Sequence, residues 1–275
     1  MILTYNISDV APYINWVYFY FAWQLKQKDE QQRMRREAET FLDEVKDRYH
    51  AHAVFRLMDA YAEGDDIVVS DADTGDCGRI FCLRQQAVGS DCLCLADFLL
   101  PKDCPSSAEQ KALLYRVGLF ATSVDAGMES DFNADPYAKM MAQLLADRLA
   151  EATAECLHEQ VRTHYWGYAP DEHLSMTDLH QEHFQGIRPA VGYPSLPDTS
   201  LNFVLDRLLG MGQIGIRLTE NGAMRPHASV SGLMMAHPRA RYFSVGKIGT
   251  DQLADYARRR GIPVEMARRF LAANL

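Results

Sequence analysis

The residues best suited to chemistry lie in one short segment, residues 185–200, which has the sequence QGIRPAVGYPSLPDTS. Three prolines and two glycines within it preclude a regular helix or strand and hold the backbone on a fixed irregular path. Arg188 offers a planar fork of donors that suits a carboxylate, and Tyr193 offers an aromatic ring and a hydroxyl. Such a segment can direct several backbone N–H and C=O groups toward a flat heterocycle. By itself, it is equally well explained as a structural loop that caps a helix.

Hydrophobic periodicity and capping residues predict the elements that must hold this segment in place. Helices are predicted over residues 25–49, 135–161, 198–209, 250–261 and from 263 onward. Strands are predicted over residues 67–69, 80–83, 92–100, 115–123, 214–219, 229–235 and 242–245, with a hairpin loop at 71–78. Because the strands occur in runs with helices grouped between them, we expect an α+β fold and not alternating βαβ units.

Two partial motif matches fail the structural requirements of the sites they resemble. Residues 210–215 fit the G-x-G-x-x-G pattern of dinucleotide-binding folds, which requires a strand before the glycines and a helix after them. Here a predicted helix precedes the glycines and a predicted strand follows, so we interpret them as a helix stop and a turn. Residues 178–183 half-match a D-x-H-x-x-G signature that ligates cobalt, but His183 replaces the glycine, so we do not expect His180 to bind cobalt.

Composition excludes several classes of protein. The 275 residues are 48% hydrophobic and 24% charged, which is typical of a globular protein. No apolar run approaches the roughly 20 residues needed to span a bilayer. With 37 acidic and 28 basic residues, the net charge of −9 argues against non-specific binding to nucleic acid. We therefore expect a cytoplasmic protein with neither a membrane nor a nucleic acid as its partner.

The cysteines and histidines lack the spacing of a metal site. The six cysteines include no C-x-x-C pair, so we interpret them as reduced, mostly buried thiols. His50/His52 and His180/His183 have ligand-like spacing, but neither pair has a partnering pair of Cys or His residues at zinc-site distances. We therefore expect this chain to hold no metal ion.

The segment RPAVGYP, residues 188–194, closely resembles the R-P-A-x-G-Y-P signature of the activation domain of cobalamin-dependent methionine synthase. Further matches to this family follow in order along nearly the whole chain. They are YINW…FYFAW near the start, LADFLLPKD (95–103), LADRLAEA (145–152), WGYAP (166–170), LTENGAM (218–224), ASVSG (228–232), HPRARYFSVGKIGTDQLADYARRRG (237–261) and FLAANL at the end. The resemblance therefore extends well beyond a single motif.

This resemblance implies a fold, a domain organisation and a ligand. The expected fold is a single C-shaped α+β domain over residues 1–275, with a curved antiparallel β-sheet flanked by helices. Residues 1–50 would form an N-terminal aromatic segment and a helix, and residues 51–275 would form the sheet, further helices and the binding site. The implied ligand is S-adenosylmethionine, lying in a shallow groove on the surface of the domain.

The resemblance also assigns individual binding residues. Arg188 would pair with the methionyl carboxylate of S-adenosylmethionine. The backbone at Ala190 and Gly192 would contact the adenine. The aromatic side chains that would flank the ligand are Tyr193, Tyr242 and Phe243.

One position departs from the family pattern. The YINW segment of the family usually carries an aspartate where this chain has Asn15, and that aspartate would accept a charge-assisted hydrogen bond from the α-ammonium of the ligand. Asn15 can accept through its carbonyl oxygen but brings no negative charge, which weakens binding by about 1–3 kcal/mol. Glu182 is a candidate for a compensating carboxylate.

The resemblance finally implies a role in reactivation. In the family, occasional oxidation leaves inactive cob(II)alamin, and the activation domain then presents the methyl group of S-adenosylmethionine to cobalt while a flavodoxin-type reductant supplies an electron. The chain would thus be a component of a methyltransferase with no catalytic side chain of its own. Its partner module or subunit would carry the cobalamin, and the chain either acts in trans or forms part of a longer protein.

Two other functions remain open at this point. The first is that of a drifted S-adenosylmethionine-binding or sensor protein without reactivation activity, for which the uncharged Asn15 is the argument. The second is that of a conventional methyltransferase with its own substrate, which would need a substrate pocket beside the methyl group.

Overall fold

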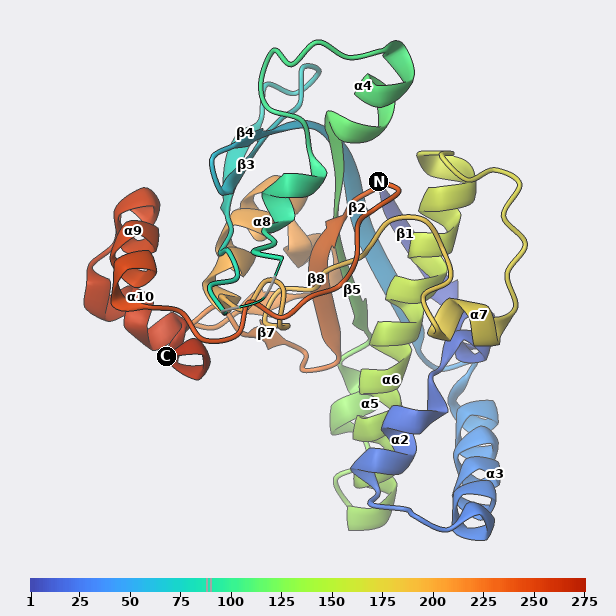
Figure 1. Ribbon diagram of the computed structural model, residues 1–275. Coiled ribbons are helices and arrows are strands. Elements are labelled where there is room, and N and C mark those ends of the chain that lie inside the picture. Colours follow the sequence, from blue (N-terminus) through green and yellow to red (C-terminus); the bar gives the residue numbers. More distant parts are fainter. Residues whose placement is uncertain (88, 90) are drawn as a thin grey trace.

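A six-stranded antiparallel sheet forms the centre of the protein in the computed structural model, which describes residues 1–87, 89 and 91–275 (Figure 1). Its strands are β1 (Ile2–Asn6), β2 (His50–Glu63), β3 (Asp66–Ser70), β4 (Cys77–Phe81), β5 (Arg116–Val124) and β8 (Ser229–Met234). They follow the order β4-β3-β2-β5-β8, with β1 also paired to β2. The short strands β6 (Arg217–Leu218) and β7 (Met224–Arg225) pair separately. The predicted α+β fold class is confirmed.

Strand β2 organises the sheet. Residues 51–59 pair with β5 along one edge, and the other edge pairs with β1 and then with β3. Sequence analysis predicted neither β1 nor β2. The β2 sequence, HAHAVFRLMDAYAE, is rich in residues that favour helices, and pairing on both edges outweighs that preference. Because β1 joins the sheet, the first 50 residues also contribute a strand to the sheet. The predicted division of the domain into residues 1–50 and 51–275 remains a prediction.

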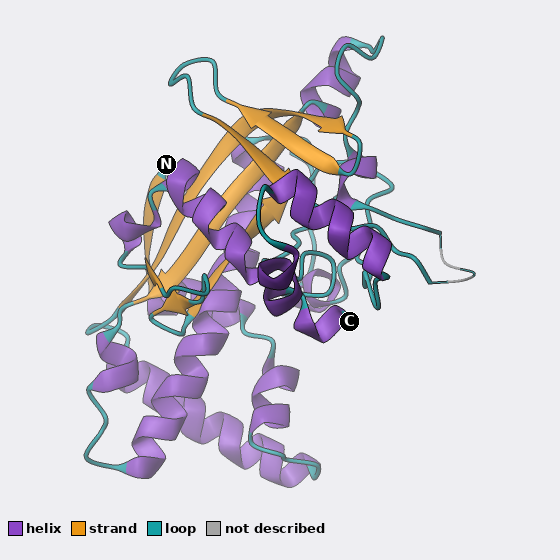
Figure 2. Cartoon of the chain, turned by 90° about the vertical axis from the view of Figure 1, so that its left-hand side faces the viewer, coloured by secondary structure: helices purple, strands orange, loops and turns teal. Residues whose placement is uncertain are grey.

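Helices cover both faces of this sheet (Figures 1 and 2). One face packs against α6 (Pro136–Gln160), which continues into a π-helical turn, η3 (Val161–Tyr165). The other face packs against α8 (Asn202–Leu209). Alternate strand residues enter the two cores: Phe55 lies in the core with α6, and its neighbour Val54 lies in the core with α8.

The remaining helices lie around this framework. Helices α2 and α3 pack along α6, away from the sheet, in the lower part of Figure 1. Among the described residues, no helix combines the length and the apolar character that crossing a membrane requires. The bounds are α1 (Ile7–Val10), α2 (Trp16–Ala22), α3 (Lys28–Val45), α4 (Ala108–Leu114), α5 (Gly127–Ser130), α7 (Met176–His180), α9 (Thr250–Arg260) and α10 (Val264–Phe270), with the 3-10 turns η1 (Ala11–Tyr13), η2 (Leu95–Phe98), η4 (Thr199–Leu201), η5 (Met211–Ile214) and η6 (Ala272–Asn274).

Most predicted helices are present, and their caps explain their ends. The Asp135 carboxylate accepts from the first N–H groups of α6, and Asp198 accepts from Ser200 N–H at 2.8 Å before α8. Gly210 ends α8 in the left-handed region, at φ +66°. A helix therefore precedes the G-x-G-x-x-G glycines and a 3-10 turn follows the first of them, so this is not the strand–loop–helix order of a dinucleotide site.

Of three further predicted strands, two are absent and one is reduced to two residues, because their apolar side chains are buried mainly without strand pairing. Residues 92–100 form an irregular segment around η2, where the Asp97 carboxylate accepts from Cys94 N–H at 2.8 Å. Residues 214–219 contain only the two-residue β6, since Gly215 turns the chain at φ +79°. Residues 242–245 run beside the 185–200 segment, and Val245 N–H donates to the Pro194 carbonyl at 2.9 Å.

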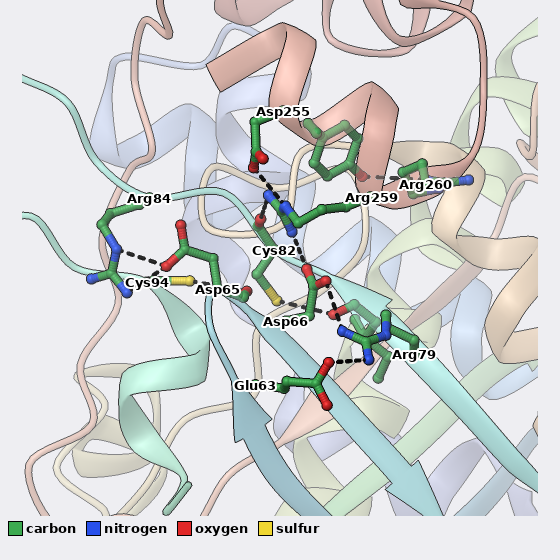
Figure 3. A network of polar contacts seen from close by, with 12 residues as sticks. Glu63, Asp65, Asp66, Arg79, Cys82, Arg84, Cys94, Asp255, Arg259 and Arg260 are labelled. Carbon is green, nitrogen blue, oxygen red and sulfur yellow. Dashed lines mark hydrogen bonds and ion pairs between the residues drawn. The ribbon is translucent and has the colours of Figure 1, made fainter. Parts of the chain in front are cut away.

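A charged network fastens α9 to the sheet edge formed by β3 and β4 (Figure 3). Asp66 is only 1% exposed and lies between two guanidinium groups, those of Arg79, at 3.2 Å, and Arg259 of α9. Arg259 also donates to Asp255 at 2.7 Å and to the Cys82 carbonyl at 3.1 Å. Since α9 directly follows residues 242–249, this network also fixes the segment that leads into the helix.

Replacing Arg259 with alanine should lower the free energy of unfolding by about 3–5 kcal/mol, because Asp66 would stay buried without one of its two cations. Arg258 provides a matched control: its side chain is 73% exposed and pairs with Asp255 at the surface. Arg258→Ala should change the free energy by no more than about 0.5 kcal/mol. Equilibrium unfolding in urea compares the two variants, and equally small losses would contradict a stabilising role for the network.

Candidate functional site

The residues predicted to bind a ligand meet at a cavity of about 650 Å³ beside α6. Three further segments complete its walls, at residues 13–18, 179–195 and 242–244. Gly192 is not among the described residues that line it; its backbone has φ +88° and its N–H donates to the Leu196 carbonyl at 2.8 Å. The predicted residues that line the cavity are Asn15, Arg188, Ala190, Tyr193, Tyr242 and Phe243.

The loop of residues 185–196 lies directly on the sheet because β8 has a glycine at the point of contact. Leu233 N–H donates to the Pro189 carbonyl at 2.9 Å. A Cβ on Gly232 would come within 2.2 Å of the Pro189 carbonyl oxygen and 2.8 Å of the Ala190 Cα. Glycine at position 232 thus permits the close approach that holds Pro189 and Ala190 in the cavity wall.

The segment that carries Tyr242 and Phe243 is tied to the same loop. Arg188 N–H donates to the Tyr242 hydroxyl at 2.8 Å, and the Ser195 hydroxyl donates to the Phe243 carbonyl at 2.5 Å. Burial raises the pKa of Tyr242 to about 12, so the hydroxyl keeps its proton at neutral pH. Because the hydroxyl oxygen accepts from Arg188, its own proton can be donated to a ligand.

Arg188 provides a buried positive charge in the cavity. Its side chain is 11% exposed, and the guanidinium carbon lies 5.7 Å from the centroid of the Phe120 ring. The counter-ion is Glu155 of α6, with 3.1 Å between Nη2 and Oε2. Burial by itself would lower the pKa of Arg188, but Glu155 and neighbouring groups raise it by more. The guanidinium therefore remains charged.

Helix α6 supplies cavity residues that sequence analysis did not identify. Arg148, Glu151, Ala152 and Glu155 share one face of the helix and line the cavity. Glu151 accepts a hydrogen bond from the Tyr193 hydroxyl. The sheet-facing side of α6 is part of the core. The sequence signal for the cavity-lining face was the presence of two glutamates four residues apart on a mostly apolar helix.

Asn15 and Glu182 reach the cavity from different segments. The Asn15 side chain caps α2, since its Oδ1 accepts from Val17 N–H at 3.2 Å. Glu182 is exposed and has its backbone in the left-handed region, at φ +60°. His180 also lines the cavity, and its Nε2 lies 3.0 Å from the Tyr13 carbonyl oxygen.

This set of groups suits a ligand that carries a carboxylate, a positive charge and an aromatic part. The guanidinium can hold the carboxylate, the glutamates can face the positive charge, and the tyrosine and phenylalanine rings can pack against the aromatic part. In the part of the chain that the structure describes, no three His, Cys, Asp or Glu side chains are grouped to hold a metal ion. A second cavity, of about 710 Å³ and lined by Asp59, Lys111 and Arg116 among others, contains none of the predicted residues.

Comparison with known proteins identifies relatives of the chain. Residues 6–261 match the family described as "Vitamin B12 dependent methionine synthase, activation domain". Among solved structures, the chain is similar to one titled "Crystal Structure of the MetH Reactivation Domain bound to AdoHcy". The two sequences are 37% identical, the TM-score is 0.90, and the match covers 100% of this chain and 90% of the other.

Replacing Gly232 with alanine should displace the 185–196 loop and lower the free energy of unfolding by about 1–3 kcal/mol, because the added Cβ meets backbone atoms. Hydrogen exchange at the Leu233 amide should also become faster, since its bond to Pro189 is broken. Gly212→Ala is the control: a Cβ there meets nothing within 4 Å. Unchanged exchange at Leu233 in the Gly232 variant would show that the loop does not depend on this contact.

Proposed function

Because the chain belongs to the activation-domain family of vitamin B12-dependent methionine synthase, we propose that it binds S-adenosylmethionine in the cavity beside Arg188. We further propose that it presents the methyl group to cobalamin held by a partner module, and so reactivates that enzyme. The observation that carries the proposal is the buried guanidinium of Arg188 in a cavity that six of the residues predicted from the sequence line.

The cavity has a suitable partner for each part of this ligand. Its volume of about 650 Å³ falls within the range of small-molecule sites, roughly 300–1,000 Å³. Arg188 would receive the methionyl carboxylate, and the carboxylates along α6 would favour the positive sulfonium. The backbone at Ala190 would meet the adenine, with the rings of Tyr193, Tyr242 and Phe243 around the ligand. For Gly192, its carbonyl is the group left to contact the adenine, because its N–H is bonded to Leu196.

A neighbouring structure supports the identity of the ligand. The similar reactivation domain is described as bound to AdoHcy. S-adenosylhomocysteine is S-adenosylmethionine without the transferred methyl group, so it shares the adenosine and amino-acid parts that the cavity would recognise. The likeness extends over the whole of this chain at 37% identity, which makes a shared ligand class a reasonable inference.

In the proposed reaction, this chain acts by proximity and orientation. Arg188 and the loop would fix the ligand with its methyl group toward the open side of the cavity. Methyl transfer from a sulfonium requires no general base, so no side chain of this site has to move a proton. Cobalamin, when bound to the partner module, supplies the nucleophile that accepts the methyl group, and a flavodoxin-type protein supplies the electron for reduction.

Calorimetric titration with S-adenosylmethionine should detect one site per chain in the wild-type protein. Arg188→Ala should weaken binding by about 10- to 100-fold, because the carboxylate loses a charge-assisted bond worth about 1.5–3 kcal/mol. 5′-Methylthioadenosine, which lacks the amino-acid part, is the matched ligand and should bind both proteins with similar affinity. Failure of the wild-type protein to bind S-adenosylmethionine would contradict the proposed function.

A second experiment distinguishes reactivation from the alternative functions. The protein is added to a methionine synthase core loaded with cob(II)alamin, together with S-adenosylmethionine and a reductant. The cobalt absorption spectrum should change only when both the protein and S-adenosylmethionine are present. Binding of S-adenosylmethionine with an unchanged spectrum would instead favour a sensor protein, and methylation of another substrate without cobalamin would favour a conventional methyltransferase.

A further inference from the structure

The amino-acid end of the proposed ligand imposes a geometric requirement on the cavity. An α-amino acid carries its carboxylate and its ammonium group on the same carbon, so the two charges lie next to each other. A site that recognises both must place a cation and an anion side by side. If Arg188 receives the carboxylate, as the proposed function holds, then the acceptor for the ammonium group must be an immediate neighbour of Arg188.

Four side chains are candidates for this acceptor, and the structure separates them. Asn15 is uncharged, and its carbonyl oxygen already accepts from Val17 N–H. Glu182 is exposed on a turn. Glu151 accepts from the Tyr193 hydroxyl. Glu155 is the carboxylate that directly contacts the guanidinium, at 3.1 Å.

The contact between Arg188 and Glu155 leaves part of the hydrogen-bonding capacity of both side chains unused. A single hydrogen bond joins Nη2 to Oε2, and Arg188 Nε and Glu155 Oε1 are buried without a hydrogen-bond partner among the described residues. Such unpaired buried atoms are costly, and a ligand that supplies partners to both would relieve that cost.

A second arginine–glutamate pair, whose arginine lies in the turn η3 that continues α6, shows the contrast. Arg162, at the end of the face that carries Glu155, donates to Glu172 from both Nε and Nη2, at distances of 2.6–3.1 Å. That side chain is fully buried and makes the forked contact that guanidinium and carboxylate favour, and only its Nη1 has no hydrogen-bond partner among the described residues. The pair at Arg188 thus lacks the forked hydrogen bonds that this protein forms elsewhere. Such a contact can be replaced when a ligand carboxylate binds to Arg188.

We infer that Glu155 accepts the α-ammonium of the ligand, and that before binding it occupies Arg188 in place of the ligand carboxylate. On binding, the carboxylate takes the guanidinium donors and Glu155 turns its free oxygen toward the ammonium group. Every buried charge therefore has a partner in both states, with one ion pair before binding and two after it. Glu155 thereby supplies the negative charge that an aspartate provides in the family pattern and that Asn15 lacks.

This arrangement makes recognition depend on both charges of the amino acid. A ligand with the carboxylate but without the ammonium group would displace Glu155 and give it no partner, leaving two anions beside one guanidinium. Removing the charge of Glu155 should therefore affect two such ligands in opposite directions. A residue that only orients Arg188 would affect both in the same direction.

The test compares S-adenosylhomocysteine with its analogue lacking the α-amino group, in the wild-type protein and in Glu155→Gln. The variant should bind S-adenosylhomocysteine about 10- to 100-fold more weakly, because a charge-assisted bond is lost. It should bind the analogue as tightly as the wild type or more tightly, because the competing anion is gone. Since both ligands are measured on the same variant, any partial loss of folded protein cancels in the ratio of the two affinities.

Glu182→Gln tests the competing acceptor, since it removes the carboxylate named from the sequence, which makes no hydrogen bond or ion pair with Arg188 among the described residues. This variant should leave the ratio of the two affinities within about 2-fold of the wild-type ratio. The inference is overturned if Glu155→Gln weakens both ligands equally, or if Glu182→Gln alone changes the ratio. Wild-type protein that binds neither ligand would instead refute the proposed function itself.

Discussion

Keeping a guanidinium charged inside the protein is the constraint on which the rest of the site depends. A buried cation is stable only beside an anion and with its donors largely satisfied. Helix α6 provides that anion, Glu155, and β5 provides the Phe120 ring against which the guanidinium lies. Arg188 can therefore sit only where the loop, the helix and the sheet meet. The cavity is located at that junction because the three elements that neutralise and enclose Arg188 also form its walls.

The irregular loop is stable because it takes the position of a further strand at the edge of the sheet. β8 is the last strand in the sheet order, and an unpaired edge would leave its backbone groups without partners. Residues of the loop form isolated bridges to it, Ile187 to Met235 and Ala190 to Gly232. The segment through Tyr242 is joined to the loop in turn, by Arg188 N–H to the Tyr242 hydroxyl and by Val245 N–H to the Pro194 carbonyl. Although its prolines exclude regular structure, the loop is held at the sheet edge by backbone hydrogen bonds to Ser231, Leu233 and Met235.

The sequence predicted those features that local chemistry controls. Caps and helical periodicity identified α6, α8 and α9, because a single side chain or glycine decides where each begins or ends. The family resemblance identified six residues of the cavity wall, whereas the charged residues that α6 contributes were not predicted. What sequence analysis missed depends on partners remote in the chain: β2 is a strand because β1, β3 and β5 pair with it, and Glu155 is a site residue because Arg188 lies opposite. The opposite error occurred at residues 92–100 and 242–245, which were predicted as strands but are irregular. Their apolar residues are buried by side-chain packing and not by strand pairing.

A site that gives a methyl group to an acceptor on another module must hold its ligand firmly at one end and leave the other end accessible. The cavity has this asymmetry. Arg188 and Ala190 are largely buried, at 11% side-chain and 6% residue exposure, while Tyr18 and Tyr193 are 60% and 50% exposed. An enzyme that methylated a small substrate of its own would need to enclose donor and acceptor together, and exposed rings would work against that enclosure. The distribution of burial across the cavity is what the proposed donor site would need, and α6 would then serve both as the core of one sheet face and as the charged wall of the site.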